Sequence, residues 1–326
     1  MSFIQALIGS ITNAGGGVPF DYSQSGGNVE TVGIYTYISW TGSGSFTINT
    51  ADRDVEWNIA GGGGSAGRNN QPTEAGGGGG AGERVTGTYS TMPAATYAVT
   101  VGAGGVTGGT SYGTGWGNNG SESKVYASGM DKLESYGGGG GMVHQWAGVA
   151  YPYRTSGKRG GCGGGNAGYF GFGVYAPAVL PAPNPAWATN AGTVGGGGSY
   201  NSSYHGAAGG GGGVVSAGGH GSNLTPWNYF ANPIYDGAGG SGGTHPMSTD
   251  SSYVPSATGG GGAGGGGGDT PTNASGGYGG GSPSSKTTDS INGTANTGSG
   301  SGSGEENSVT GNGGSGYVIC RWVTLI

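Results

Sequence analysis

Aromatic and basic side chains are the residues of this 326-residue chain best suited to binding chemistry, and they gather in the stretches between glycine runs. Tyrosine and tryptophan combine rigid contact area with a polar atom, so binding loops favour them. Arginine and lysine beside them can bind phosphate or an acidic sugar. The candidate binding residues are Tyr151, Tyr153, Arg154, Lys158, Arg159, Tyr169, Phe170, Phe172, Trp187, Trp227, Tyr229 and Phe230.

A structural interpretation of the same aromatic residues stays open. Long stretches such as 143–159 and 169–190 separate glycine runs that offer no side chains to bury. Their aromatic rings could lie over the glycine-rich part and supply its missing apolar burial, or pack against a neighbouring subunit.

Catalytic and metal-binding patterns are weak in this sequence. Residues 239–243 read GGSGG and match G-x-S-x-G, but no strand-to-helix context surrounds them. With 88 glycines, G-x-G-x-x-G arises from composition alone. The histidines have no i, i+4 partner and lie in glycine-flanked stretches at His144, His205, His220 and His245. No carboxylate pair suggests glycan cleavage. We therefore expect no enzyme, no cofactor and no metal site.

The composition first suggests disorder and then argues against it. Glycine and proline are abundant, at 88 and 14 residues, which is typical of low-complexity chains. Disordered chains usually carry high net charge, whereas charged residues make up only 8% here and aromatic residues reach 10%. The net charge is −6 with only 10 lysines and arginines, so nucleic-acid binding is not expected.

The ends of the chain carry no export signal that we recognise. The first basic residue is Arg53, and no apolar run approaches the ~20 residues of a membrane-spanning helix. We expect a protein made in the cytoplasm. Cys162 and Cys320 have no metal-ligand spacing; they are either isolated small apolar residues or a disulfide.

Residues 1–28 form an N-terminal docking segment in this interpretation. An apolar stripe at helical spacing consists of Phe3, Ile4, Leu7, Ile8 and Ile11. A glycine run at 15–17 would end such a helix. An isolated helix this short is marginal in water, so it needs a covering surface. That surface is either another protein or the chain's own domain.

Residues 29–326 are expected to form one all-β domain. Period-two alternation and β-branched or aromatic residues predict strands within 29–60 and at 96–101. The last strand, 317–326, is apolar on both faces apart from Arg321 and Thr324, which predicts a central buried strand. The N-terminal strands and this last strand would form a β-sandwich that brackets the glycine-rich part.

Residues 61–316 form the glycine-rich body with long loops between its runs. Ordering glycine costs more backbone entropy than ordering any other residue, so something that only glycine permits must offset it. Polyproline II helices without Cβ atoms can pack side by side and bond their backbones to one another. Flexible glycine-rich connectors are the alternative. The similar lengths of the runs favour packed polyglycine helices.

The order of these segments resembles a known family. FTINTADRDVEWNIAGGGGSAG is followed by TYAVTVGAGG, further glycine runs and a closing GNGGSGYVICRW, so residues 45–326 resemble the glycine-rich domains of phage tail-fibre and receptor-binding proteins. The resemblance implies a folded body with polyproline II packing and exposed loops that contact a host surface. Residues 1–28 carry no such resemblance.

The resemblance implies a virion structural protein of a phage tail fibre or fibre tip. Its expected partners are other virion proteins of the fibre, baseplate or tail tip, a host cell-surface glycan or outer-membrane protein, and sister chains in a homo-oligomer such as a trimer. A purely architectural virion protein without receptor contact is the main alternative. The irregular aromatic loops disfavour a polyproline II antifreeze or silk-like protein.

Overall fold

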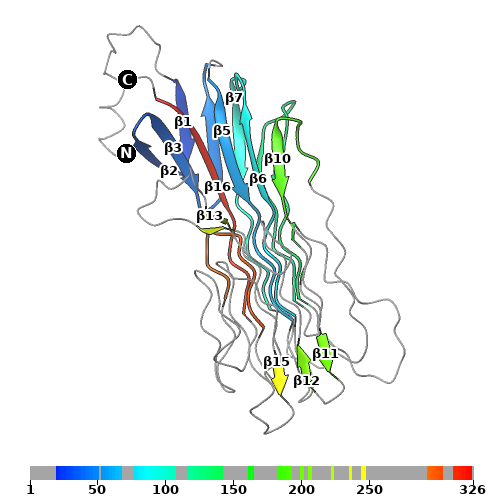
Figure 1. The fold of residues 1–326 in the computed structure, drawn as a ribbon. Helices are drawn as coiled ribbons and strands as arrows, with labels where there is room; N and C mark the ends of the chain where they lie inside the picture. Colours follow the sequence, from blue (N-terminus) through cyan, green and yellow to red (C-terminus); the bar gives the residue numbers. More distant parts are fainter. Residues whose placement is uncertain are drawn as a thin grey trace.

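The computed structural model describes residues 20–50, 53–67, 77–107, 117–141, 161–162, 164, 182–192, 292–303 and 311–324 in full, and the backbone of five short strands between residues 199 and 246. Two sheets form a β-sandwich at one end of an elongated molecule (Figure 1). Extended glycine-rich segments continue from these strands and run side by side toward the other end. Within the described residues, every regular element is a β-strand, as the sequence predicts.

The first sheet has five antiparallel strands in the order β1-β4-β7-β8-β9. They are β1 (Tyr22–Ser25), β4 (Gly44–Ile48), β7 (Ala95–Thr100), β8 (Ser123–Tyr126) and β9 (Leu133–Ser135). The strand predicted at 96–101 is β7, displaced by one residue. Both β8 and β9 are additions to the elements expected from the sequence.

The second sheet has six antiparallel strands in the order β10-β6-β5-β16-β3-β2. They are β2 (Asn28–Val32), β3 (Tyr35–Trp40), β5 (Val55–Ala60), β6 (Arg84–Tyr89), β10 (Ala188–Ala191) and β16 (Tyr317–Val323). The last strand, β16, lies between β3 and β5 and pairs with both. The predicted pairing of the N-terminal strands with the last strand is therefore confirmed.

Five shorter strands lie outside the sandwich. Three of them form a small sheet: β11 (Ser199–Asn201), β12 (His205–Ala207) and β15 (Thr244–Pro246). Figure 1 places this sheet at the end of the molecule far from the sandwich. The other pair is β13 (Ser222–Asn223) with β14 (Tyr235–Asp236).

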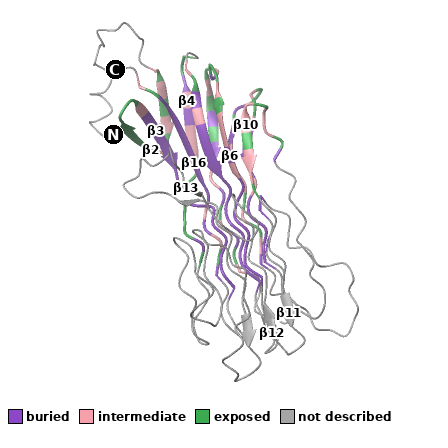
Figure 2. Ribbon diagram, viewed as in Figure 1, coloured by how far each residue is buried: buried purple, intermediate pink, exposed green. Residues whose placement is uncertain are grey.

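Aromatic residues fill the space between the two sheets. Alternate residues of each strand point inward, and Trp40, Phe46 and Trp57 are almost wholly buried. The Phe46 ring packs edge-on against both tryptophans, with centroids 6.1 Å from Trp40 and 5.9 Å from Trp57, a favoured aromatic geometry. Burial continues from the sandwich into the glycine segments (Figure 2).

The central strand β16 is buried on both faces along most of its length, as predicted. Arg321 points away from the core and is only 8% exposed. Its guanidinium lies 4.4 Å from the Tyr35 ring centroid and donates to Glu56 Oε2 at 2.6 and 3.0 Å. An ion pair and a cation–π contact thus hold this charge on the outer face of the sheet.

Cys162 and Cys320 form no disulfide with each other, so the disulfide that the sequence left open is not formed. Cys320 lies in the sandwich core, and its burial raises the pKa of the thiol well above its ordinary value. Cys162 packs instead against Ala81 among the glycine segments. Both behave as small apolar residues.

Candidate functional site

The backbone N–H groups of segment 61–67 donate hydrogen bonds in a repeat of three residues. Every third donor reaches segment 77–83: Gly61 N to Glu83 O (3.2 Å), Gly64 N to Gly80 O (2.8 Å) and Gly67 N to Gly77 O (2.9 Å). The other bonds that its N–H groups donate to backbone reach two other segments: Gly62 N to Ser121 O (2.9 Å), Ser65 N to Asn118 O (2.9 Å) and Gly63 N to Gly314 O (2.8 Å). Ala66 N donates instead to a side chain, Ser301 Oγ (2.8 Å). Successive residues of segment 61–67 therefore bond in three different directions.

The carbonyl groups of the same segment accept hydrogen bonds from three further segments. The donors are Gly138 N to Gly62 O (2.7 Å), Gly141 N to Ser65 O (2.9 Å), Gly105 N to Gly63 O (2.8 Å) and Ser301 N to Gly64 O (3.2 Å). Segment 61–67 is thus the centre of a glycine bundle, which we define as segments 61–67, 77–83, 102–107, 117–121, 136–141, 292–303 and 311–316. The six segments around it provide hydrogen-bond partners for its backbone N–H and C=O groups, without forming a conventional β-sheet.

The spacing between these segments excludes side chains. A Cβ atom on Gly62 would lie 2.1 Å from Ala103 O, and one on Gly63 would lie 2.0 Å from Ser299 O. Both contacts are with backbone atoms, which cannot move aside as a flexible side chain can. The approach of Cα to a carbonyl oxygen is itself favourable, as a weak Cα–H···O contact. Glycine is therefore required by packing at these two positions.

On the side away from the sandwich, the described segments of the glycine bundle reach a common level. Segments 61–67, 102–107 and 136–141 lead away from the ends of β5, β7 and β9. On that side, Gly67 N donates to Gly77 O (2.9 Å), Gly117 N to Gly141 O (3.0 Å) and Thr107 N to Asn312 Oδ1 (2.8 Å). These described segments therefore reach the same level of the bundle, on the side away from the sandwich. The small sheet β11-β12-β15 lies at this end (Figure 1).

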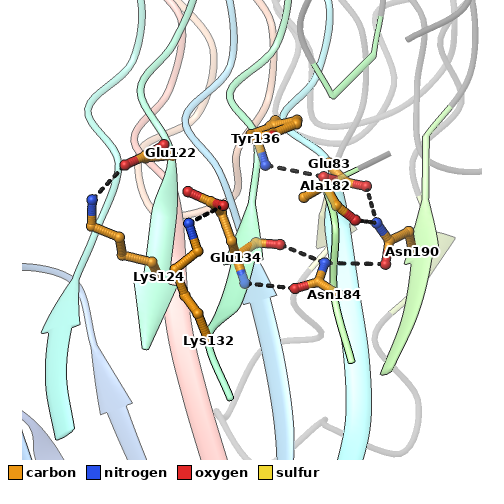
Figure 3. A network of polar contacts seen from close by, with 9 residues as sticks. All are labelled: Glu83, Glu122, Lys124, Lys132, Glu134, Tyr136, Ala182, Asn184 and Asn190. Atoms are coloured by element: carbon orange, nitrogen blue, oxygen red, sulfur yellow. Dashed lines mark hydrogen bonds and ion pairs between the residues drawn. The ribbon is translucent and has the colours of Figure 1, made fainter. Parts of the chain in front are cut away.

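A polar network joins the bundle to the edges of both sheets (Figure 3). We define this edge clasp as Glu83, Glu134, Asn184 and Asn190. Asn184 accepts from Glu134 N at 2.8 Å and donates to Glu134 O at 2.7 Å, so one side chain satisfies both backbone groups of a residue on edge strand β9. Asn190, in β10, donates to Glu83 Oε1 at 2.7 Å. The clasp thus joins the edge of the first sheet to that of the second.

Glu83 is the buried charge at the centre of the clasp. It is 2% exposed, and its carboxylate also accepts a hydrogen bond from Tyr136 N at 3.1 Å. Burial raises the pKa of Glu83, while bonds from Tyr136, Asn190 and Ala182 act in the opposite direction. With three donors around it, this carboxylate holds segment 182–190 in place.

Two ion pairs lie at strands β8 and β9, and one of them includes Glu134 of the clasp (Figure 3). Glu122 bonds Lys124 at 2.5 Å, and Glu134 bonds Lys132 at 2.5 Å. The hydrogen bond from Lys124 is the largest cause that lowers the pKa of Glu122. Each carboxylate therefore has a lysine partner.

A family model for the glycine-rich domain matches residues 38–323. The chain belongs to this family. The match begins within β3 and ends with β16, so it covers the glycine bundle and the strands of the sandwich except β1 and β2. No curated protein matches the chain significantly.

Of the aromatic and basic residues proposed for binding, only Trp187 lies among the described residues of this glycine-rich domain. It packs against Tyr89 with ring centroids 4.9 Å apart and is partly buried beside the sandwich core. Its Nε1 donates to Asp131 Oδ2 at 3.5 Å. The other eleven candidates lie outside the described residues, as does the whole proposed docking stripe of Phe3, Ile4, Leu7, Ile8 and Ile11.

The histidines and possible metal ligands give no site in the part that the structure describes. The backbone places His205 in β12 and His245 in β15, in strands that pair with each other. His144 and His220 lie outside the described residues. No group of three or more potential ligands gathers among the described residues. No helix among these residues is long and apolar enough to span a membrane.

The residues of the edge clasp were missed by the sequence analysis. Glu83 and Asn190 are 107 positions apart, and Glu134 and Asn184 are 50 apart. The one local indication in the sequence is the position of two residues relative to glycine and to the strands. Glu83 follows Gly82 and directly precedes β6, and Asn190 lies in β10, two residues before Gly192. Polar residues beside a glycine run are thus candidates for contacts where bundle and strand meet.

Proposed function

We propose that the glycine bundle is a set of packed polyproline II helices. A polyproline II helix has 3 residues per turn and no internal hydrogen bonds, so every backbone group must bond elsewhere. The three-residue repeat of donors along segment 61–67 supports this geometry. Such a bundle is a stiff scaffold made from backbone alone.

The function that this scaffold supports best is presentation of loops by a virion protein of a phage tail fibre or fibre tip. The single observation that carries it is that segments 61–67, 102–107 and 136–141 follow three different strands of the sandwich and run side by side, hydrogen-bonded to one another, away from it. Stretches that begin at one level can meet one surface together, which favours recognition by several loops at once.

The chemistry of these stretches supports a host-surface ligand. The sequence that follows Gly141 holds Tyr151, Tyr153 and the basic cluster of Arg154, Lys158 and Arg159. This combination suits a glycan that carries phosphate or acidic groups, or an outer-membrane protein with such a surface. Further along the same insertion, the edge clasp fixes residues 182–190 to the sandwich.

We propose other virion proteins as the partners of the N-terminal segment. Residues 1–28 carry an uncharged apolar stripe that fits a covering surface in the fibre, baseplate or tail tip, and sister chains in a homo-oligomer such as a trimer would use the same stripe. A protein of this kind is found in the virion.

The test uses purified virions of the phage that encodes the chain, together with its host cells. Mass spectrometry should detect the chain in the particles. Purified protein added to cells should slow phage adsorption in proportion to its concentration. A variant that carries Arg154→Ala, Lys158→Ala and Arg159→Ala should lose this competition, while the control Val323→Ala, an exposed change on the sandwich, should retain it.

Two results would separate recognition from a purely architectural role. If the chain is present in virions but neither the protein nor the triple variant affects adsorption, the chain is architectural and the recognition part of the proposal is wrong. If purified virions lack the chain, the virion assignment itself is wrong.

A further inference from the structure

The outer face of the first sheet is rich in hydroxyl groups, some of them exposed and some half-buried. Core residues such as Phe46 and Tyr97 alternate with residues that point outward. The outward hydroxyl residues of β1, β4 and β7 are Ser23, Ser25, Ser45, Thr47, Thr96 and Thr100. Pairing aligns them in rows across the strands, with Thr47 opposite both Ser23 and Thr96.

One exposed aromatic ring stands at the β8 side of this face. Tyr126 is 43% exposed, and its cross-strand partner on β7 is Ala98, which is itself exposed. Because alanine is small, it leaves room beside the tyrosine ring. An exposed aromatic ring next to hydroxyl groups suits a sugar, whose C–H face packs on the ring while its hydroxyl groups exchange hydrogen bonds with the sheet.

The charges beside the ring are neutralised within the protein. Lys124 pairs with Glu122 and Lys132 with Glu134, each at 2.5 Å (Figure 3). The lysines therefore leave no net charge to attract an anion. Their ion-paired groups can still donate to and accept from ligand hydroxyls.

From this arrangement, we propose that the outer face of the first sheet, centred on Tyr126, binds a neutral glycan chain. The surface lacks the apolar centre that a protein interface requires, since Tyr126 and Ala98 are its apolar members. The site consists of residues on the outer face of the sandwich, and its binding does not depend on the host recognition proposed for the loops.

Affinity electrophoresis of the full chain in gels that contain dextran, mannan or galactan tests the proposal, with alginate and heparin as anionic controls. At least one neutral polysaccharide should retard the protein. Tyr126→Ala should weaken that binding about fivefold, in line with the loss of an aromatic contact, whereas Tyr126→Phe should retain most of it. Val323→Ala, exposed on the other sheet, is the matched control and should bind like the unmodified chain.

Amide chemical shifts give a second readout that depends on location. The bound neutral polysaccharide should shift the amide resonances of Thr96, Ala98 and Tyr126. The proposal is overturned if none of the three neutral polysaccharides binds, if only the anionic ones bind, or if Tyr126→Ala binds as tightly as the unmodified chain. The Arg154, Lys158 and Arg159 variant should retain neutral-glycan binding, so failure of the loop proposal and failure of this one are distinguishable.

Discussion

Replacing Gly63 by alanine should destabilise the protein strongly, because no Cβ fits at this position. The added atom would lie 2.0 Å from Ser299 O and 2.3 Å from Ser299 C. Ordinary Cβ contacts begin at 3.4 Å, so segment 292–303 would have to move away by about 1.4 Å. Both contacts are with backbone atoms of Ser299, so no change of side-chain rotamer can remove the clash.

The size of the effect follows from the hydrogen bonds that this movement would break. Segment 292–303 is bound to the centre of the bundle by Ser301 N to Gly64 O (3.2 Å) and by Ala66 N to Ser301 Oγ (2.8 Å). It also accepts a bond from Gly314 N at Ser299 O (2.8 Å). Three buried bonds at ~1–2 kcal/mol each give a loss of ~3–6 kcal/mol in the free energy of unfolding. That is a large part of the stability of a typical domain.

Gly42→Ala is the matched control for this substitution. Nothing lies within 4 Å of a Cβ at Gly42, and its φ is not in the left-handed region. Alanine there should leave stability unchanged or raise it by up to ~1 kcal/mol, because it restricts the unfolded chain. Chemical unfolding followed by tryptophan fluorescence and by amide hydrogen exchange of the bundle measures both variants. Equal stability of the two variants would refute close packing of the glycine bundle.

Three further predictions concern the edge clasp and the cysteines. Burial raises the pKa of Glu83 in the folded protein, so the folded state binds a proton more readily than the unfolded state does. The free energy of unfolding should therefore fall as pH rises from about 4.5 through the folded-state pKa. Glu83→Gln should flatten this part of the stability–pH curve measured by urea unfolding. Asn184→Ala leaves the backbone of Glu134 without two partners, so it should cost ~1–3 kcal/mol and speed amide exchange at that residue. Cys162 and Cys320 should react with a thiol reagent only after unfolding, since both thiols are buried and are not joined in a disulfide. Rapid reaction of the folded protein would contradict their buried placement.

The strands with clear alternation could be predicted from the sequence. Val55, Trp57 and Ile59 share one face of β5 and are buried in the core, and Tyr97 and Val99 do the same in β7. Such alternation depends only on the spacing of residues within one strand, so it can be recognised without knowing which strands pair.

The strands that were missed lack this pattern. β6 contains a glycine, Gly87, and only one of its residues is buried. β9 and β10 are three and four residues long, so alternation has little room to appear. These strands form because neighbouring strands supply hydrogen bonds, which is tertiary information.

The clasp and the hydroxyl-rich face could not be predicted for a related reason. Asn190 meets Glu83 only after β10 pairs with β6, and Thr47 meets Thr96 only after β4 pairs with β7. Serine, threonine and asparagine are also common in loops, so their presence did not distinguish a sheet face from a turn. The glycine runs were informative because their number and similar length favoured packing.

The sandwich determines the direction in which the N–H groups of each segment in the glycine bundle point. Segments 61–67, 102–107 and 136–141 each follow a strand whose register is fixed by core side chains. Two buried serines continue the bonding where the ladder stops: Ser135 Oγ accepts from Gly61 N at 2.7 Å, and Ser123 Oγ donates to Ala60 O at 2.6 Å. Because the donors repeat every three residues, the first bonded glycine determines the direction of all that follow. The aromatic core therefore stabilises the bundle indirectly, by aligning segments that have few side chains to specify their own register.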